Sequence, residues 1–342
     1  MKIAIVKLSA LGDIVHAMIV LQYIKKFSPD ITLDWVVEES YKELLEFHPD
    51  INKVHTINFK NSKKKKSFYL LYLELKKLQK KSGPYDLVID MQGLIKSAII
   101  SRCIPSKVTL GFEKSSAREG LASIFYNKTF KSSYDNNVIE RNFEIIKFAL
   151  DFPFNVEDIG NKLPFLYSDQ KYLNAHLSKV KKNIILIPGA SFSSKQYSVE
   201  KFAELANLLN ANYLVIWGSE EEKFLADKIK KISPQVNICE KLSIKDLISL
   251  ISKIDLVIGP DTGPTHMAWA LGRPSITLFG PTPGYRNTYV TKINRIIESK
   301  SEVNPYKIDK NDYSIRVIDI NDILQVAKDL LNQNFLTKND FD

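Results

Sequence analysis

The chain has few of the residues that build disulfide frameworks and metal sites. Its 342 residues include two cysteines, Cys103 and Cys239, and five histidines. Two cysteines cannot form a disulfide framework, and these two lack the spacing of a metal-ligand pair. No paired-aspartate metal site stands out in the sequence either. We therefore expect a protein of a reducing compartment that needs no metal.

The sequence also lacks four features that would assign it to other classes of protein. No uncharged apolar run approaches the roughly 18 residues that a membrane-spanning helix needs. A strand pattern begins within two residues of Met1, so we expect no signal peptide. The G-x-G-x-x-G fingerprint is absent, which argues against a dehydrogenase. No recognition motif for nucleic acid appears, so we expect no nucleic-acid partner.

Two successions of alternating strands and helices occupy most of the chain. A length of 342 residues favours two domains, each able to bury a core. The periodicity fades over residues 151–170, where we place the linker. We expect an α/β protein of two facing Rossmann-like domains, 1–165 and 166–342, with a cleft between them. The closing helix over 321–332 could also pack back on the first domain.

The individual elements follow from hydrophobic periodicity. In the first half, strands are predicted over 2–7, 31–37, 53–58, 85–91 and 107–111, and helices over 13–27, 40–47, 68–80, 94–102 and 138–150. In the second half, strands are predicted over 183–187, 213–217, 256–258 and 275–279, and helices over 198–209, 220–232, 243–252, 265–271 and 321–332. Residues 112–136 are predicted to be loops with a short helix. Functional residues should follow the strands, because ligands of open parallel sheets bind beyond the strands' carboxyl ends.

The positive charge of the chain is concentrated in one segment. Residues 53–81 hold ten lysines and one acid, a net charge of +9 that equals the net charge of the whole chain. Such a segment suits an anionic partner, such as a phosphorylated lipid surface, an acidic sugar or a nucleic acid. A solvated loop and helix face would explain it equally simply. The absence of a nucleic-acid motif makes that partner the weaker alternative.

A strand, a polar turn and an apolar helix follow one another over residues 257–271. The turn holds Asp261, Thr262 and Gly263, and His266 lies in the first turn of the helix. Unpaired N–H groups at a helix start form an anion site. In the second half of an alternating α/β chain, this arrangement predicts a nucleotide-diphosphate site. His266 could instead be a structural hydrogen-bond donor.

Three further loops carry charged residues after predicted strands. Asp13 is predicted at the N-cap of the first helix, where it is either a cap or a base for an acceptor hydroxyl. Lys195 could neutralise a diphosphate or lie on the surface. Glu222 could hold a ribose, but an acid at a helix start also suits the helix dipole. Lys96 and Arg118 lie near strand ends, and taken alone each is more typical of a surface.

Together these segments resemble the ADP-heptose:lipopolysaccharide heptosyltransferases, which form glycosyltransferase family 9 and have the GT-B fold. The resemblance runs from residue 1 to about residue 290. The stretches at 92–98 and 117–127 are most similar to the heptosyltransferase I branch, which adds the first heptose to Kdo of the lipopolysaccharide inner core. The matching stretches are 6–16, 34–39, 85–98, 117–127, 261–266 and 273–282.

The resemblance implies a role for each candidate residue. Asp13 would be the general base for the Kdo hydroxyl, and Lys195 would meet the diphosphate with Ser191 close by. Glu222, or its neighbour Glu220 or Glu221, would hold the adenosine ribose. The phosphates and sugar of ADP-heptose would be bound by Asp261, Thr262, Gly263 and His266. In the loop before Lys195 the family has two consecutive hydroxyl residues, and here Ala190 replaces the first.

The acceptor implied by the resemblance is Kdo-lipid A, in which Kdo has a carboxylate and lipid A has phosphates. The residues that would face it are Lys63, Lys64, Lys65, Lys66, Lys96 and Arg118. We expect a monomer, bound peripherally to the cytoplasmic face of the inner membrane, that inverts the heptose without a metal or other cofactor. The alternatives are heptosyltransferase II or a later ADP-heptose transferase, a GT-B enzyme that uses a UDP-sugar, and a non-catalytic protein that binds sugar nucleotides or lipid A.

Overall fold

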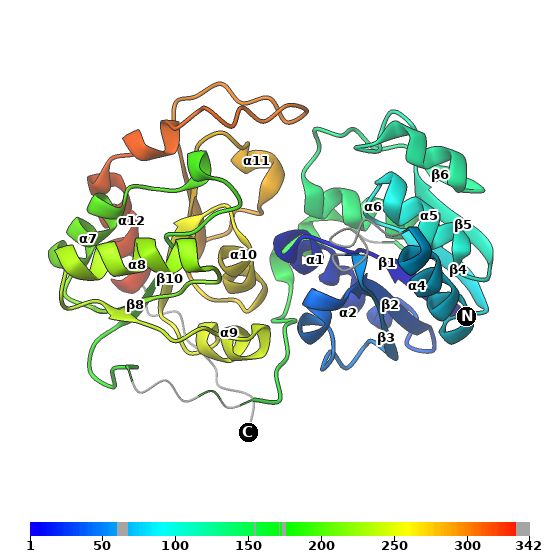
Figure 1. Ribbon diagram of the computed structural model, residues 1–342, viewed down its shortest axis with the longest axis horizontal. Coiled ribbons are helices and arrows are strands. Elements are labelled where there is room, and N and C mark those ends of the chain that lie inside the picture. The colour runs from blue at the N-terminus through cyan, green and yellow to red at the C-terminus, as the bar shows by residue number, and fades with distance from the viewer. Residues whose placement is uncertain (60–67, 154, 171, 173–175, 333–342) are drawn as a thin grey trace. The chain divides into compact units, whose positions relative to one another are not determined.

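The computed structural model describes residues 1–59, 68–153, 155–170, 172 and 176–332, and it has two compact units. The first unit comprises residues 1–171 and 285–289, and the second comprises 172–284 and 290–342. Each unit contains one sheet of six parallel strands with helices packed on it (Figure 1). The short segment 285–289 belongs to the first unit although both of its flanks belong to the second.

The first unit is built around a buried, mostly apolar central strand. Ile3, Ala4, Ile5 and Val6 have no exposed surface, as expected for a parallel strand that is covered on both faces. The strands are β1 (Lys2–Val6), β2 (Thr32–Glu38), β3 (Lys53–Ile57), β4 (Tyr85–Asp90), β5 (Ser106–Phe112) and β6 (Lys128–Phe130). The α-helices are α1 (Leu11–Met18), α2 (Val20–Phe27), α4 (Phe68–Lys81), α5 (Ile95–Cys103) and α6 (Val138–Leu150). The 3₁₀ helices are η1 (Glu39–Leu44), η2 (Gly120–Phe125) and η3 (Val156–Asn161).

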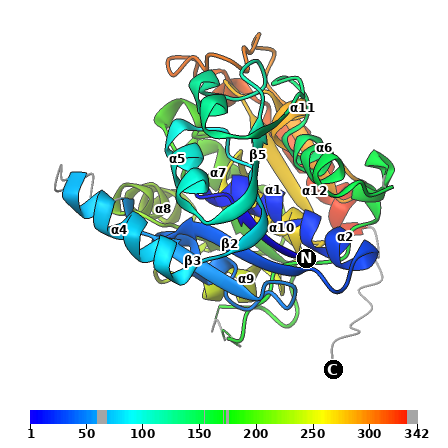
Figure 2. The ribbon, with the colours of Figure 1, turned by 90° about the vertical axis from the view of Figure 1, so that its right-hand side faces the viewer.

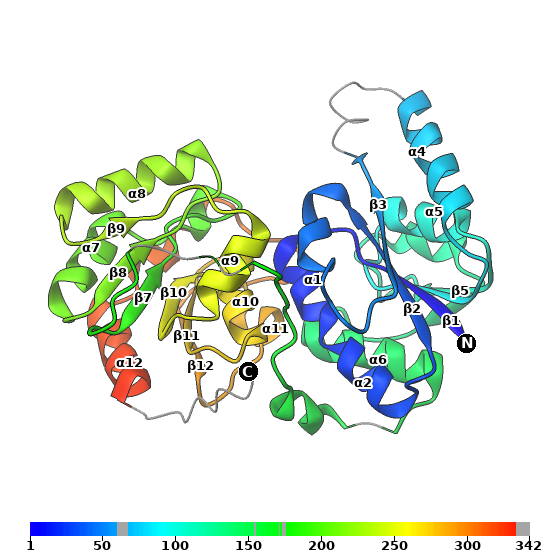
Figure 3. The same ribbon diagram turned by 90° about the horizontal axis from the view of Figure 1, so that it is seen from below.

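Helices cover the sheet of the first unit. The helix α4 lies along β3 and beside α5, as Figure 2 shows. Figure 3 shows α6 next to α1 and α2, and the aromatic rings of Tyr23 and Phe143 meet edge to face there with centroids 4.9 Å apart. Burial of these apolar faces stabilises the unit at about 25 cal/mol for each Å² removed from water.

The second unit repeats this plan. Its strands are β7 (Asn183–Leu186), β8 (Asn212–Val215), β9 (Asn237–Ile238), β10 (Leu256–Pro260), β11 (Ser275–Phe279) and β12 (Asn294–Glu298). Its helices are η4 (Ser193–Lys195), α7 (Val199–Leu208), α8 (Glu220–Ile232), α9 (Ile244–Ile251), α10 (Gly263–Ala270), η5 (Ser314–Val317) and α12 (Ile320–Asn332). The one-turn helix α11 (Gly284–Asn287) begins at the last residue of 172–284 and continues into the segment 285–289 of the first unit. The closing helix α12, for which packing on the first domain was one expectation, packs against α7 and β10–β12 of its own unit, and Ile323 and Ala327 are fully buried in that core (Figure 1).

Both sheets have the same doubly wound strand order. The first runs β3-β2-β1-β4-β5-β6, and the second, in the same sense, runs β9-β8-β7-β10-β11-β12. The strand order reverses between β1 and β4 in the first sheet and between β7 and β10 in the second. Ligands of such sheets bind at this reversal, beyond the carboxyl ends of the two strands. The fold thus marks one position in each unit where a site is expected.

The structure corrects several predicted elements. The single helix predicted over 13–27 is two helices, and the first begins at Leu11 rather than Asp13. The strands β6, β9 and β12 and the one-turn helix α11 were not predicted. β6 and β9 have only three and two residues, which is too short to show an alternating pattern. β12 reads Asn-Arg-Ile-Ile-Glu, with polar residues at both ends of an apolar pair.

Candidate functional site

The two strand-order reversals carry two different polar sites. In the first unit a pocket opens after β1 and β4, and it is lined by residues from 7 to 142 together with Arg286. In the second unit a cluster of buried polar side chains follows β7 and β10. Each site lies within one unit, and each contains residues that the sequence singled out.

Asp13 lies in the pocket of the first unit, and its side chain is exposed there. Asp13 was predicted at the N-cap, but it is the third residue of α1, and the N-cap residue is Ala10. Its Oδ2 accepts a hydrogen bond from the Ala10 N–H at 3.1 Å, so it caps the helix from inside the first turn. Because the carboxylate has several acceptor positions, this bond leaves Asp13 able to accept a proton from a ligand hydroxyl.

The loop that carries Asp13 is held by Gln92, which follows β4. The Gln92 Oε1 accepts hydrogen bonds from the Leu8 and Ser9 N–H groups at 2.9 and 3.2 Å, and its Nε2 donates to the Ser9 carbonyl at 2.7 Å. The backbone on both sides of the strand-order reversal is therefore tied together. This fixes the start of α1, and with it the place of Asp13.

Positive charge dominates the same pocket. Lys7, Arg118, Arg141 and Arg286 all line it, and Asp13 is the one acid among its described lining residues. Lys7 is 9% exposed, and its Nζ donates to the Met91 carbonyl at 2.8 Å. Burial lowers the pKa of Lys7, and the nearby Asp13 and Asp90 oppose that shift. A pocket of this kind suits an anionic ligand.

Aromatic rings hold two of these cations. The Arg141 guanidinium lies 4.6 Å from the centroid of the Phe112 ring and 5.3 Å from that of Tyr134. Its Nη2 donates to the Ser116 carbonyl at 2.6 Å. The Arg286 guanidinium also lies over the Tyr134 ring, at 4.3 Å. Stacking on rings keeps a guanidinium in one plane and reduces the entropy that it loses on binding a ligand.

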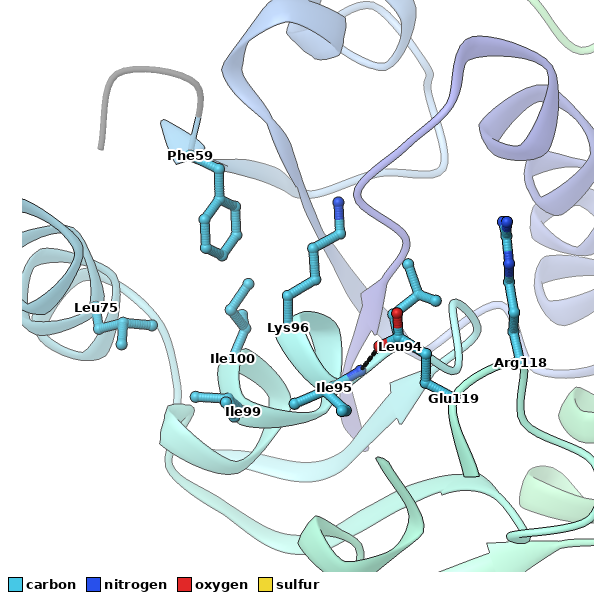
Figure 4. A pocket seen from close by; sticks show the side chains of 9 residues that line it. All are labelled: Phe59, Leu75, Leu94, Ile95, Lys96, Ile99, Ile100, Arg118 and Glu119. Carbon is cyan, nitrogen blue, oxygen red and sulfur yellow. Dashed lines mark hydrogen bonds between the residues drawn. The ribbon is translucent and has the colours of Figure 1, made fainter. Parts of the chain in front are cut away.

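A second, more apolar pocket adjoins the first and shares Leu94 and Arg118 with it. It measures about 610 Å³. Its wall is formed by Phe59, Leu75, Leu94, Ile95, Ile99 and Ile100, with Lys96, Arg118 and Glu119 as the charged lining residues (Figure 4). Lys96 Nζ lies 5.9 Å from the Phe59 ring centroid and 3.4 Å from Ser9 Oγ. Lys96 and Arg118, which taken alone are each more typical of a surface and which the resemblance assigns to the acceptor, thus line one pocket.

In the second unit, Asp261 contacts two of the other predicted site residues, Lys195 and His266. Its Oδ2 accepts from Lys195 Nζ at 2.8 Å, and its Oδ1 lies 2.9 Å from His266 Nε2. Thr282 Oγ1 also donates to Oδ2, at 3.1 Å. Burial would raise the pKa of Asp261, but Lys195 and His266 lower it well below its usual range. The carboxylate therefore stays ionised and holds Lys195 at the end of β7.

The helix start predicted to bind phosphate is present as α10. Thr262 is its N-cap residue, and Gly263 and Pro264 begin the helix. The Thr262 N–H donates to Thr265 Oγ1 at 3.2 Å, which satisfies one group of the turn. Two buried hydroxyls, Thr262 Oγ1 at this N-cap and Ser194 Oγ next to Lys195 in the sequence, have no hydrogen-bond partner among the residues that the structure describes. Unsatisfied buried hydroxyls are costly and are typical of a site that awaits a polar ligand.

Of the three acids at the start of α8, Glu222 is the one that turns back to the sheet. Its Oε2 accepts from the Gly218 N–H at 2.6 Å, at the end of β8. Its carboxyl group also lies against Gly189 at the end of β7, where any side chain would clash with it. Glu221 instead bonds to Ser219 in its own turn. The geometry therefore favours Glu222 over Glu221 as a ligand residue, and Ser191 is exposed in the loop that follows Gly189.

Over the described ranges of the chain, no cluster of three or more His, Cys, Asp or Glu residues is arranged to hold a metal ion. In the same part of the chain, no helix has the length and apolar character that crossing a membrane requires.

Comparison with known proteins assigns the family. The model of "Glycosyltransferase family 9 (heptosyltransferase)" matches residues 75–312. This chain belongs to glycosyltransferase family 9. It is 38% identical to "Lipopolysaccharide heptosyltransferase 1" of Campylobacter coli over 96% of this chain and 99% of that protein.

Solved structures of family 9 members share the fold. "E. coli heptosyltransferase WaaC with ADP" superposes with a TM-score of 0.78 and 24% identity, covering 96% of this chain and all of that one. "E. coli ADP-heptose lps heptosyltransferase II" superposes with a TM-score of 0.72 and 18% identity, covering 97% and 98%. The chain is therefore an α/β glycosyltransferase with the fold of these proteins, as predicted. At these identities the fold does not separate one heptosyltransferase from another.

The structure also adds residues to the site that the sequence did not single out. Lys7, Gln92, Arg141 and Arg286 line the first unit's pocket beside Asp13. Lys7 and Gln92 both follow strands, so the rule that located Asp13 applied to them too. Arg141 is on α6, away from any strand end, and Arg286 is on α11 after β11, a strand of the second unit, so only the tertiary fold brings these two residues to the pocket of the first unit. The predicted acceptor residues Lys63, Lys64, Lys65 and Lys66 lie outside the described residues.

Proposed function

We propose that this family 9 enzyme transfers L-glycero-D-manno-heptose from ADP-heptose to Kdo of the lipopolysaccharide inner core. The observation that carries the proposal is the pocket of the first unit, where the exposed carboxylate of Asp13 lies among Lys7, Arg118, Arg141 and Arg286. A base surrounded by cations is suited to deprotonate a hydroxyl on an anionic sugar. Kdo is such a sugar because it bears a carboxylate.

The second unit supplies the groups that a nucleotide-sugar donor needs. Lys195 is a cation held by Asp261, and the start of α10 offers backbone N–H groups to a diphosphate. The Glu222 carboxylate, which lies against Gly189 and Gly218 in the loops after β7 and β8, can accept hydrogen bonds from the ribose hydroxyls. The heptosyltransferase WaaC of E. coli has been solved with ADP and with ADP-2-deoxy-2-fluoro heptose, which supports ADP-heptose as the donor here.

The chemical step is one inverting displacement. Asp13 takes the proton of the Kdo hydroxyl as the hydroxyl oxygen forms a bond to the anomeric carbon of the heptose. The bond from that carbon to the phosphate oxygen breaks on the opposite face, and ADP leaves. Lys195 and the α10 N–H groups stabilise the negative charge that develops on the departing phosphate. Because these groups do the work of stabilising the leaving group, we infer that the reaction needs no metal.

The acceptor is Kdo-lipid A in this proposal. Lipid A has phosphates and acyl chains, and the first unit has an apolar pocket with Lys96 and Arg118 in its lining, continuous with the Asp13 pocket. An amphiphilic acceptor fits this pairing of an apolar wall with cations. The same surface, with the basic segment 53–81, supports peripheral binding to the cytoplasmic face of the inner membrane by a monomer.

The test is a transfer assay with the purified protein, ADP-heptose and Kdo-lipid A, analysed by mass spectrometry of the product. We expect one heptose to be added, in excess EDTA as well as without it, and we expect inhibition by ADP but not by UDP. Transfer only to acceptors that already contain heptose would instead identify a heptosyltransferase II or a later enzyme. Binding of both substrates without any transfer would identify a non-catalytic binding protein.

A further inference from the structure

The segment Tyr285–Tyr289 packs as part of the first unit, although the chain reaches it from the second. Asn137, the N-cap residue of α6, holds it by donating from Nδ2 to the carbonyls of Tyr285 and Thr288 at 2.9 and 2.7 Å. The Oδ1 of the same side chain accepts from the Ile139 N–H at 2.9 Å. The Asn137 amide thus caps α6 through its oxygen and holds the segment 285–289 through its nitrogen.

This anchoring places Arg286 in the pocket that contains Asp13. The Arg286 Nε donates to the Tyr134 carbonyl at 2.9 Å, and its Nη1 donates to Asn287 Oδ1 at 3.1 Å. Its guanidinium lies over the Tyr134 ring, 4.3 Å from the centroid. Within the described part of the chain, Nη2 has no hydrogen-bond partner. Two bonds and a ring therefore fix the plane of the guanidinium while one terminal nitrogen is left for a ligand.

The other three cations of the pocket are arranged differently. Lys7 Nζ is bonded to the Met91 carbonyl, and burial lowers its pKa. Arg141 is 7% exposed, and its guanidinium is enclosed by the Phe112 and Tyr134 rings. Arg118 is exposed and also lines the apolar pocket, which places it toward the lipid-bearing part of an acceptor. Arg286 alone among the four combines side-chain hydrogen bonds and a ring contact that orient its guanidinium with a half-buried position in the pocket.

We propose that Arg286 is the residue that recognises the carboxylate of the acceptor sugar, through the Nη1 and Nη2 edge of its guanidinium. The proposal rests on the function proposed above, because it concerns the acceptor of that reaction. A guanidinium edge matches the two oxygens of a carboxylate, and it would discriminate against neutral sugars of similar shape.

Arg286 follows a turn whose first residues belong to the donor cluster and its neighbours. Thr282, which bonds to Asp261 in the donor cluster, precedes Arg286 by only three intervening residues. Gly284 between them is fixed by the bond from its N–H to Glu298 Oε1 at 2.9 Å. The residue that selects the acceptor is therefore held by a turn that also contacts the donor cluster. A variant that only disordered this turn would impair donor binding as well, whereas a variant that lost carboxylate recognition would not.

The test is a double-mutant cycle in which one partner is the Arg286 side chain and the other is the carboxylate of the acceptor. Transfer is measured for the parent enzyme and for Arg286→Gln, each with the Kdo acceptor and with an acceptor whose carboxylate is reduced to a hydroxymethyl group. We expect the loss of either partner alone to lower kcat/KM by about 10- to 100-fold through the KM for the acceptor. Loss of both should cost little more than loss of one. The KM for ADP-heptose should stay within a few-fold of the parent value.

Two further variants complete the design. Arg295→Gln is the matched control, because Arg295 lies exposed on β12 and, among the described residues, donates a hydrogen bond to the nearby Lys292 carbonyl alone. This variant should behave as the parent with both acceptors. Arg286→Lys keeps the charge without the planar edge and should recover part of the loss, and it carries the test if Arg286→Gln does not fold.

The outcomes separate the two claims. Equal and independent losses from Arg286→Gln on both acceptors, or a matching rise in the KM for ADP-heptose, would give Arg286 a purely structural role and overturn the inference alone. Absence of transfer by the parent enzyme to either acceptor would overturn the proposed function, and the inference with it.

Discussion

Two buried carboxylates, Asp34 and Asp261, differ in role according to whether they lie within a strand or after it. Asp34 lies within β2, where it is 1% exposed and accepts from Asn52 Nδ2 at 2.8 Å and from the Tyr85 hydroxyl at 2.6 Å. His55 Nε2 is 3.2 Å from the same carboxylate. These partners join β2 to β3 and β4, so Asp34 stabilises the sheet. Asp261 follows β10 and has a lysine partner that a ligand can recruit.

The Asp34 cluster predicts how stability depends on pH. Burial alone would raise the pKa of Asp34, but the hydrogen bonds from His55, Asn52 and Tyr85 lower it to about 2. A carboxylate whose pKa is depressed in the folded state contributes stability above its unfolded pKa of about 4, and that contribution is lost as the pH falls through about 2. Asp34→Asn should therefore lower the free energy of unfolding at pH 7 by roughly 1–3 kcal/mol, because it leaves buried donors without a charged partner.

The measurement is urea unfolding of the parent and Asp34→Asn between pH 7 and pH 2. The difference between the two proteins should shrink as the pH falls from about 4 to about 2, because Asp34 of the unfolded parent becomes protonated first and Asp34 of the folded parent only near pH 2. Asp30→Asn, at an exposed position before β2, is the control and should match the parent throughout. A difference that did not change with pH would show that packing, rather than the charge of Asp34, stabilises the sheet.

At the scale of the elements, the predicted site residues lie in the turns and helix starts that follow strands, where ligands of open parallel sheets bind. Asp13, Lys195, Glu222 and Asp261 follow β1, β7, β8 and β10, and the helix starts near them were predicted within two residues. Local sequence is sufficient for these positions because a strand, a turn and a helix start are each short-range patterns. It is insufficient for Arg286, since nothing in a five-residue segment shows that Asn137 anchors it from a distant helix.

The start of α8 offers a test with a matched pair of acids on adjacent residues. Glu222 faces Gly189 and Gly218 at the strand ends, whereas Glu221 bonds within its own turn. Glu222→Gln should weaken ADP binding by about 10-fold or more, because ribose hydroxyls would lose a charged acceptor. Glu221→Gln should bind ADP as the parent does, because Glu221 bonds within its own turn. It is a matched control because both substitutions remove one negative charge from the same helix start. Calorimetric titration with ADP measures both, and equal weakening by the two variants would refute the assignment of Glu222.

At the scale of the whole molecule, the net charge and the apolar pocket both indicate an anionic, amphiphilic partner. The basic segment 53–81 accounts for a net charge equal to that of the entire chain, and the apolar pocket is lined by Phe59 and Leu75 from the same part of the sequence. The sequence located this charge but could not locate the pocket, because α4 and α5 form its wall only after they pack together.

This distribution of charge predicts membrane binding that depends on salt and on the basic segment. The parent protein should sediment with liposomes that contain anionic lipid and should be released as ionic strength rises, since surface charges are screened over about 8 Å at physiological salt. Replacement of Lys63, Lys64, Lys65 and Lys66 by Ser should reduce the bound fraction severalfold. Replacement of four lysines in the second unit, Lys181, Lys223, Lys228 and Lys231, is the control for net charge. Equal binding by both variants would contradict a role for this segment.

The central claim is that Asp13 is the base of a heptosyl transfer, and one comparison tests it most directly. Transfer from ADP-heptose to Kdo-lipid A is measured for the parent and for Asp13→Asn, whose side-chain oxygen can still accept the hydrogen bond from the Ala10 N–H. We predict that the parent transfers heptose and that the variant loses about 100-fold or more in kcat, while the affinity for ADP-heptose is unchanged. A variant that retained kcat within a few-fold of the parent would reduce Asp13 to a helix cap and contradict the mechanism.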